Sequence, residues 1–365
     1  MPVRYRADHV GSLLRPPELL AARQAFDEGR LAIETLHNIE DRAIDDAVRR
    51  QREVGLDIVT DGEMRRGSWL SPLANAVDGF TQAHVLLDWK GPGAATEPTK
   101  ARVAGAKLRK RDKLTADELP WLKRSAGAPF KITLPAASNF MLASYKPGVT
   151  DQFYESRALL LADIAEILRD EVQWLVGQGA AYIQLDAPYY SHYLDAEQRK
   201  RIEQSGVDPD AALETAIAGD NATLKGIDRE RVTCALHVCR GNNRSRWYTQ
   251  GAYEAIAERL FADLDVDTFL LEYDDDRSGS FEPLRWLPSH KTAVLGLVTT
   301  KRASLESQDT IRGRIDEATR HVPLDNLALS PQCGFASVAT GNLLSIDDQW
   351  RKLELVVSTA RSVWK

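Results

Sequence analysis

A short apolar run near residue 235 ends in a histidine and a cysteine that lie two residues apart. The run Val232–Leu236 is typical of a buried strand, and it continues through His237 and Cys239 into a Gly-Asn-Asn turn. Residues two apart on a strand share a face, so both side chains point the same way where the strand ends. Imidazole nitrogen and thiolate sulfur are preferred ligands of zinc. Taken alone, however, such a pair is more often simply packed into the core.

Two further apolar runs end in side chains of the same kind. Thr268–Leu271 is followed by Glu272, and the run beginning at Leu327 is followed by Cys333. In a parallel α/β barrel the carboxyl ends of the strands meet on one face, which carries the active site. The pattern therefore predicts one zinc ion, held by His237, Cys239, Glu272 and Cys333.

The third cysteine serves as an internal comparison. Cys234 lies an odd number of residues from Cys239 on the same predicted strand, so it faces the opposite side, and we expect a small buried hydrophobe there. Three cysteines are too few for a disulfide framework, and two of them are better used as metal ligands. We therefore expect a cytoplasmic protein.

The motifs together resemble those of one enzyme family. His-x-Cys, Leu-Glu and Pro-x-Cys-Gly follow one another in the order of the zinc signature of the cobalamin-independent methionine synthases. The resemblance extends from His9-Val10-Gly11-Ser12 to the last predicted helix. It implies a single catalytic barrel of that family, without the duplicated N-terminal barrel of the long enzymes.

Three other predicted strands end in polar residues that extend this resemblance. Ser12 belongs to a Gly-Ser segment similar to the one that holds the amino-acid carboxylate in the family. Glu63 and Asp186 match the two acidic residues that bind the amino group of homocysteine. Two carboxylates also make charge-assisted hydrogen bonds with one ammonium group, which agrees with this role. For each residue alone, a salt bridge to an arginine or a helix cap is the alternative.

The predicted metal site is anionic, because two thiolates and a carboxylate outweigh the charge of Zn²⁺. Such a zinc ion binds a substrate thiol, removes its proton and keeps the sulfur nucleophilic. The chemistry it favours is attack by sulfur on an electrophilic carbon. A purely structural zinc site is the alternative, but structural sites usually take ligands from close-spaced motifs, whereas these residues span positions 237 to 333.

The predicted methyl-donor side departs from the family pattern. Lys301 stands where folate-using members have a histidine that acts on the leaving pterin, and Ala143 stands where they have an aromatic residue that stacks on it. We expect an activated donor in place of methyltetrahydrofolate, and Lys301 is a candidate catalytic residue. A fixed ammonium there would suit an anionic group of the donor or acceptor.

Chain length and patterning predict an α/β fold, a single (β/α)₈ TIM barrel spanning residues 1–365 with an insertion after strand 2 at about 69–127. Strands are expected at 7–12, 56–60, 130–134, 181–185, 232–239, 268–272, 291–298 and 327–333. The formal charge of −6 argues against a nucleic-acid partner, and no apolar run is long enough to cross a membrane.

These features predict a zinc-dependent S-methyltransferase of methionine synthase type, acting on a small-molecule thiol such as homocysteine and a methyl donor. One alternative is a related alkyltransferase or lyase for another small thiol, similar to the epoxide–coenzyme M transferases. Another is a non-catalytic zinc-binding or amino-acid-binding protein. The pattern leaves open the identity of the donor and the oligomeric state.

Overall fold

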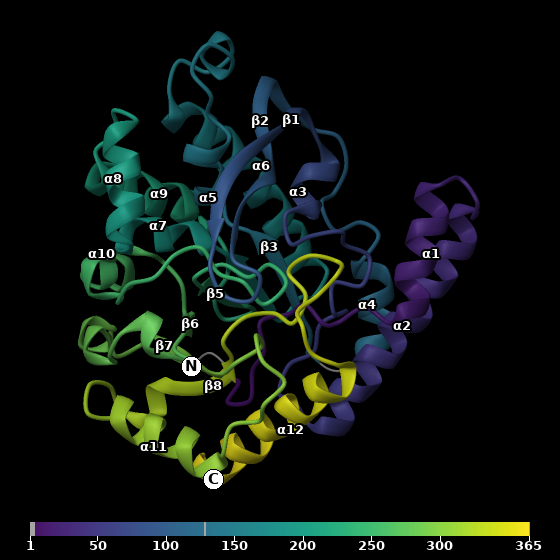
Figure 1. Ribbon diagram of the computed structural model, residues 1–365, viewed down its shortest axis with the longest axis vertical. Coiled ribbons are helices and arrows are strands. Elements are labelled where there is room, and N and C mark those ends of the chain that lie inside the picture. Colours follow the sequence, from purple (N-terminus) through teal and green to yellow (C-terminus); the bar gives the residue numbers. More distant parts are fainter. Residues whose placement is uncertain (1–3, 128, 365) are drawn as a thin grey trace.

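A parallel sheet of six strands forms the centre of the computed structural model, which describes residues 4–127 and 129–364 (Figure 1). The strands pair in sequence order, each with the next. All of their residues are buried, as expected for parallel strands covered on both faces. The strands are β3 (Lys131–Pro135), β4 (Tyr182–Asp186), β5 (Thr233–Val238), β6 (Thr268–Glu272), β7 (Thr292–Val298) and β8 (Leu327–Pro331).

The first two predicted strands are much shorter than expected. In segment 7–12, Ala7 makes a single parallel bridge to Leu329 of β8, and in segment 56–60, Val59 makes one to Phe130 beside β3. A hydrogen bond from the Asp57 N–H to the Ala7 carbonyl, 3.1 Å long, links the two segments. The segments therefore lie beside the two edge strands of the sheet and contact each other.

Helices lie outside the sheet (Figure 1). Local capping explains several ends: the Ser156 hydroxyl accepts the Leu159 N–H at the start of α6, and Gly55 ends α2 with a left-handed backbone. The helices are α1 (Pro17–Asp27), α2 (Ile33–Val54), α3 (Ser71–Ala76), α4 (Leu119–Ala126), α5 (Ser138–Ala143), α6 (Arg157–Gly177), α7 (Ser191–Leu194), α8 (Ala196–Gln204), α9 (Pro209–Leu224), α10 (Glu254–Asp263), α11 (Gln308–Ala318) and α12 (Ile346–Val363). No helix in the described part of the chain is long and apolar enough to span a membrane.

A small cluster of buried apolar side chains lies apart from the main core. Seven segments of the chain contribute one residue each, including both segments that lie beside the sheet edges. The members are Val10, Ile58, Tyr182, Ala235, Leu270, Val294 and Ala328. One compact cluster thus connects the beginning of the chain with five of the six central strands.

The region predicted as an insertion contains a long antiparallel hairpin, formed by β1 (Val77–Trp89) and β2 (Ala95–Lys110) (Figure 1). Two lysines of β2 make ion pairs with α6: Lys107 pairs with Asp163, and Lys110 with Asp170. These pairs hold β2 against the helix.

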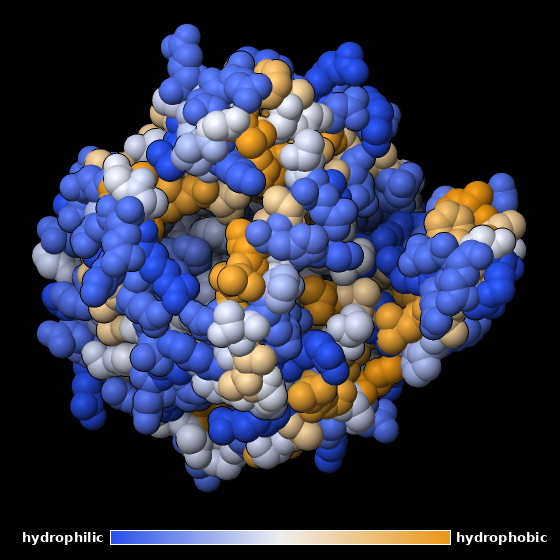
Figure 2. Space-filling model, turned by 45° about the horizontal axis from the view of Figure 1, so that its top comes forward, coloured by the Kyte–Doolittle hydropathy of each residue, from blue (hydrophilic) through white to orange (hydrophobic). Residues whose placement is uncertain are grey.

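The space-filling view shows one mostly hydrophilic face of the molecule, with apolar side chains beside a hollow near its centre (Figure 2).

Candidate active site

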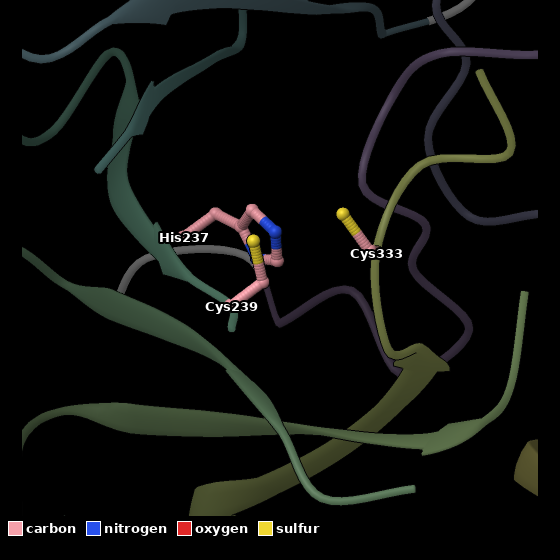
Figure 3. A group of neighbouring side chains, drawn as sticks. All are labelled: His237, Cys239 and Cys333. Atoms are coloured by element: carbon pink, nitrogen blue, oxygen red, sulfur yellow. The ribbon is translucent and has the colours of Figure 1, made fainter. Parts of the chain in front are cut away.

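Three of the four predicted metal ligands lie together at the carboxyl ends of the strands. β5 carries His237, Cys239 directly follows its last residue, and the segment after β8 carries Cys333. Their nitrogen and sulfur ligand atoms lie within 4.8 Å of one another, and all three residues are buried. Figure 3 shows the Cys333 thiol pointing across the gap toward the His237 ring and the Cys239 thiol.

The hydrogen bonding of His237 leaves one ring nitrogen available to a metal ion. Its Nδ1 lies 3.3 Å from the Leu270 carbonyl oxygen, a distance that suits an N–H donor at Nδ1. The tautomer with this proton carries its lone pair on Nε2, which is buried without a hydrogen-bond partner among the described residues. An unpartnered buried nitrogen beside two thiols fits a metal site, since burying a polar atom without a partner is costly.

The two thiols are electrostatically different although they are neighbours. A hydrogen bond with Cys239 lowers the pKa of the Cys333 thiol well below its usual range, helped by His237 and Lys301. The same hydrogen bond, together with burial, raises the pKa of Cys239. Burial lowers the pKa of His237, but Cys333 and nearby carboxylates outweigh it and raise that pKa. Cys333 is therefore the sulfur that most readily carries negative charge.

Glu272, the fourth predicted ligand, is not part of this three-residue group among the described residues. Its Oε2 accepts the Arg240 N–H at 3.0 Å, and its Oε1 accepts the Arg277 Nε–H at 3.2 Å. Burial opposes ionisation of Glu272, but the charges of Lys301, Arg277 and Arg240 outweigh it and lower the pKa. The arginine contact was not predicted, because it depends on the short turn after β6, which brings Arg277 back toward the strand.

A cavity of about 110 Å³ opens onto the His-Cys-Cys group and also reaches all three predicted substrate residues. Its walls include the three sulfur and nitrogen donors, together with Ser12, Glu63 and Asp186. Six of the eight predicted site residues thus border one cavity, whereas Glu272 and Lys301 are not among its lining residues.

Glu63 has a carboxylate oxygen free for a ligand. Its Oε1 accepts the Thr133 hydroxyl at 2.8 Å and lies 3.5 Å from Arg66, whereas its Oε2 is buried without a partner among the described residues. The Glu63 backbone has φ 56°, a left-handed conformation that is uncommon for a residue with a side chain and frequent at functional sites. The strain and the unpartnered oxygen together favour a binding role.

Asp186 lies at the end of β4, and its Oδ1 accepts the Gln184 amide N–H at 2.7 Å. Burial raises the pKa of Asp186 to about 7, against the opposing charge of His237. Glu63 adds to this increase, which indicates that the two carboxylates repel each other. A cation placed between them would relieve this repulsion and favour the ionised forms.

Ser12 packs closely against Gly334, the residue that follows Cys333. The Ser12 hydroxyl accepts the Ala336 N–H at 3.4 Å, and a side chain on Gly334 would overlap its oxygen. Glycine at 334 therefore lets the segment carrying Cys333 lie against Ser12 without displacing the hydroxyl. This contact joins the first segment of the chain to the His-Cys-Cys group.

Lys301 is directed at the turn after Cys239. Its Nζ donates to the Gly241 carbonyl at 2.8 Å and lies 3.4 Å from Asn242 Oδ1, and the side chain is buried. These contacts fix the backbone of the turn that follows His237 and Cys239. The predicted direct role of Lys301 in catalysis has no corresponding contact with the cavity.

The hairpin contributes cavity residues that the sequence analysis did not identify. Val85, Leu87 and Trp89 alternate along β1, so they share one face, and Thr99 and Lys100 of β2 also line the cavity. The alternating pattern of this region was the available signal. It gave no information on which part of the molecule the hairpin covers.

A family model described as the catalytic domain of cobalamin-independent synthase matches residues 7–346. The chain belongs to the cobalamin-independent methionine synthase family. Its similarity extends over almost the whole length of several relatives.

Among these relatives, the uncharacterized protein YxjH of Bacillus subtilis is 37% identical, with 99% of this chain and 95% of that protein aligned. A methionine synthase of Thermococcus kodakarensis is 26% identical, with 89% and 85% covered. A crystal structure described as a putative vitamin-B12-independent methionine synthase from Listeria monocytogenes has a TM-score of 0.78 and 28% identity. That match covers 100% of this chain and 99% of the other. These similarities support a methyltransferase-type enzyme that acts on small molecules.

Proposed function

We propose that this chain is a zinc-dependent S-methyltransferase of methionine synthase type that methylates a small thiol such as homocysteine. The observation that carries the proposal is the shared cavity of the His-Cys-Cys group and the carboxylates of Glu63 and Asp186. One side of this cavity suits a sulfur-binding metal, and the other suits the ammonium group of an amino acid.

In this proposal His237, Cys239 and Cys333 hold the zinc ion, and Glu272 is the fourth ligand. Ligation by Glu272 would replace one of its contacts to Arg240 or Arg277. The bound zinc supplies a lowered pKa for the substrate thiol, so that the sulfur reacts as a thiolate. The net negative charge of the ligand set preserves the nucleophilicity of that sulfur.

The other residues bind and orient the amino-acid thiol. Glu63 Oε2 and the Asp186 carboxylate accept hydrogen bonds from its ammonium group, and the segment of Ser12 receives its carboxylate. Lys301 acts as a positioning residue, because its ammonium group holds the Gly241 carbonyl rather than lining the cavity. The hairpin side chains exclude water from the reacting sulfur.

We further propose that the sheet closes into a (β/α)₈ barrel and that residues 1–365 form one domain, with residues 69–127 as its insertion. The bridges of Ala7 and Val59 to the edge strands, and the link between segments 7–12 and 56–60, support closure. The small apolar cluster supports it as well, since a flat sheet could not bring residues near both edges into one cluster. A cytoplasmic location remains part of this proposal.

The direct test combines zinc analysis with a methyl-transfer assay on purified protein. We expect stoichiometric zinc and formation of methionine from homocysteine, with methyltetrahydrofolate a poor donor beside methylcobalamin and S-methylmethionine. Faster alkylation of a thiol without an amino group would favour the epoxide–coenzyme M type of enzyme. Tight thiol binding without transfer from any of the donors would favour a binding protein and contradict the proposed activity.

A further inference from the structure

The hairpin forms a fixed wall of the cavity. Its tip pairs with the loop after β5 through two backbone hydrogen bonds, from the Lys90 N–H to the Trp247 carbonyl at 2.6 Å and from the Trp247 N–H back at 3.2 Å. Arg246 of the same loop forms an ion pair with Glu97 of β2 at 2.9 Å. This loop follows His237 and Cys239 in the chain. Its contacts therefore hold the hairpin next to these two residues.

This wall continues into a row of aromatic rings. The Trp89 and Tyr248 centroids lie 5.3 Å apart, Tyr248 and His192 lie 5.5 Å apart, and His192 and Tyr189 lie 4.6 Å apart. Trp89, Tyr248 and Tyr189 line the cavity, as does Trp69. Such electron-rich rings attract cations, most strongly cations with methyl groups and little hydration.

The size of the cavity restricts the donor. Its volume of about 110 Å³ is well below the roughly 300–1,000 Å³ typical of pockets for drug-sized ligands. The cavity therefore favours a compact donor beside an amino-acid thiol while the hairpin is docked. A compact molecule with a few methyl groups would fit.

The charges around the cavity favour a positive donor. Glu63 and Asp186 present their carboxyl groups to the same cavity, and Oε2 of Glu63 has no hydrogen-bond partner among the described residues. The single lysine among the lining residues in the described chain, Lys100, is exposed, so its ammonium group can stay in solvent or meet a carboxylate of the donor. Lys301, which a basic leaving group would need as an acid, donates instead to Gly241.

We propose that the hairpin wall and its aromatic row form a subsite for a compact methylated onium cation, which donates the methyl group. This inference rests on the proposed function. The thiolate sulfur of the acceptor attacks the methyl carbon, and a carbon–sulfur bond forms. The bond between that carbon and the onium atom breaks, and its electron pair stays on the donor, which leaves as a neutral thioether or tertiary amine. No proton is needed by the leaving group, in agreement with the position of Lys301.

The test measures binding by calorimetry on the purified protein as isolated. Dimethylsulfonioacetate and glycine betaine are each compared with the uncharged-carbon analogue of the same shape, 3-methylbutanoate and 3,3-dimethylbutanoate respectively. We expect each onium to bind roughly tenfold more tightly than its analogue. The two pairs separate a sulfonium preference from an ammonium preference.

Variants test whether the aromatic row causes the tighter binding of the onium compounds. Trp89→Leu and, as an independent second variant, Tyr189→Leu should each remove most of the onium preference, whereas Trp286→Leu, at an exposed tryptophan outside the cavity, should retain it. Equal binding of onium and analogue, or a preference unchanged in both cavity variants, would overturn the inference.

Transfer assays then separate this inference from the proposed function. Methylation of homocysteine by an onium donor at a higher rate than by methyltetrahydrofolate supports both. Efficient transfer from the folate without any onium preference overturns the inference and leaves methionine synthesis intact. An onium preference without thiol methylation by any donor contradicts the proposed function and shows that the aromatic subsite binds cations without transferring their methyl groups, which overturns the donor role.

Discussion

The side-chain nitrogen of Lys301 lies 2.8 Å from the carbonyl oxygen of Gly241. Through this contact the segment after β7 holds the turn that follows Cys239, so the carboxyl ends of β5 and β7, which lie on either side of β6 in the sheet, are joined. A lysine in this position carries a buried positive charge near Glu272 and Cys333, and it lowers the pKa of both. It therefore influences the site without bordering the cavity.

Replacing Lys301 by methionine should destabilise the protein, because the buried Gly241 carbonyl would lose a charged hydrogen-bond donor. We expect a loss of about 1.5–3 kcal/mol in the free energy of unfolding, measured by chemical denaturation. Lys225→Met, at an exposed lysine, should change it by less than about 0.5 kcal/mol. Equal stability of the two variants would contradict the positioning role of Lys301.

Cys239→Ser and Cys333→Ser should each lose bound zinc, whereas Cys234→Ser should retain it. All three cysteines are buried, but only the first two belong to the His-Cys-Cys group. Metal content by mass spectrometry after gel filtration gives the comparison. The assignment would be wrong if all three variants contained as much zinc as the parent protein.

Glu63→Gln and Asp186→Asn should weaken the binding of homocysteine by about 1.5–3 kcal/mol, the range for a hydrogen bond to a charged group. The same variants should bind 4-mercaptobutanoate, which lacks the amino group, as well as the parent protein does. Glu155→Gln, at an exposed glutamate, is the matched control and should bind both thiols normally. A uniform loss for both thiols would indicate general damage to the cavity and not a missing ammonium contact.

Gly91→Ala should loosen the hairpin tip more than Gly93→Ala. Both glycines have positive φ angles, of 94° and 65°, so both substitutions introduce backbone strain. Only at Gly91 would the new side chain overlap the Trp247 ring, since Gly93 has open space around it. Limited proteolysis within residues 77–110 should be faster for Gly91→Ala, and identical cleavage rates would show that docking on Trp247 does not hold the hairpin.

The stability of the protein should contain a pH-dependent contribution from Asp220 of α9. Burial raises the pKa of Asp220 to about 6, although it accepts hydrogen bonds from the Ser138 N–H and the Tyr190 hydroxyl. In the unfolded chain its pKa is near 3.9. Between these values the folded protein holds a proton that the unfolded chain has released, so stability falls as pH rises from about 4 to about 6 and then levels off.

Asp220→Asn removes this titration. The unfolding free energy of the parent protein minus that of the variant should fall by roughly 2–3 kcal/mol over that pH range. Any change in hydrogen bonding caused by the amide adds a constant offset that does not depend on pH. A difference that stays constant between pH 4 and pH 6 would contradict the raised pKa of Asp220.

The sequence contained enough information for the family and for most of the central elements. Strand β6 matches its predicted range of 268–272, and helix α12 begins at a capping box of Ser345 and Asp348, which is a local sequence feature. Strand-end placement also brought His237 and Cys333 together, although nearly a hundred positions separate them. These features depend on local patterns and on one general rule for parallel strands.

Other features were missed because they depend on contacts between distant residues. The pairing of Arg277 with Glu272 requires a turn whose geometry no local pattern specifies. Segments 7–12 and 56–60 have strand-like composition, but their pairing is limited to single bridges. The docking of the hairpin on Trp247 depends on a loop more than 150 residues later in the chain, so the sequence of the predicted insertion does not indicate where the hairpin lies.

The contact between Ser12 and Ala336 joins positions 324 residues apart in the chain. During synthesis, the first segment must therefore remain without its final neighbours until almost the whole chain has left the ribosome. Contacts of such long sequence separation form late and slow folding. Cys333 is delivered in the same last step, so a nascent or C-terminally truncated chain would lack both the closing contact and the complete His-Cys-Cys group. With the proposed zinc site, metal uptake would then require that synthesis has passed the end of β8.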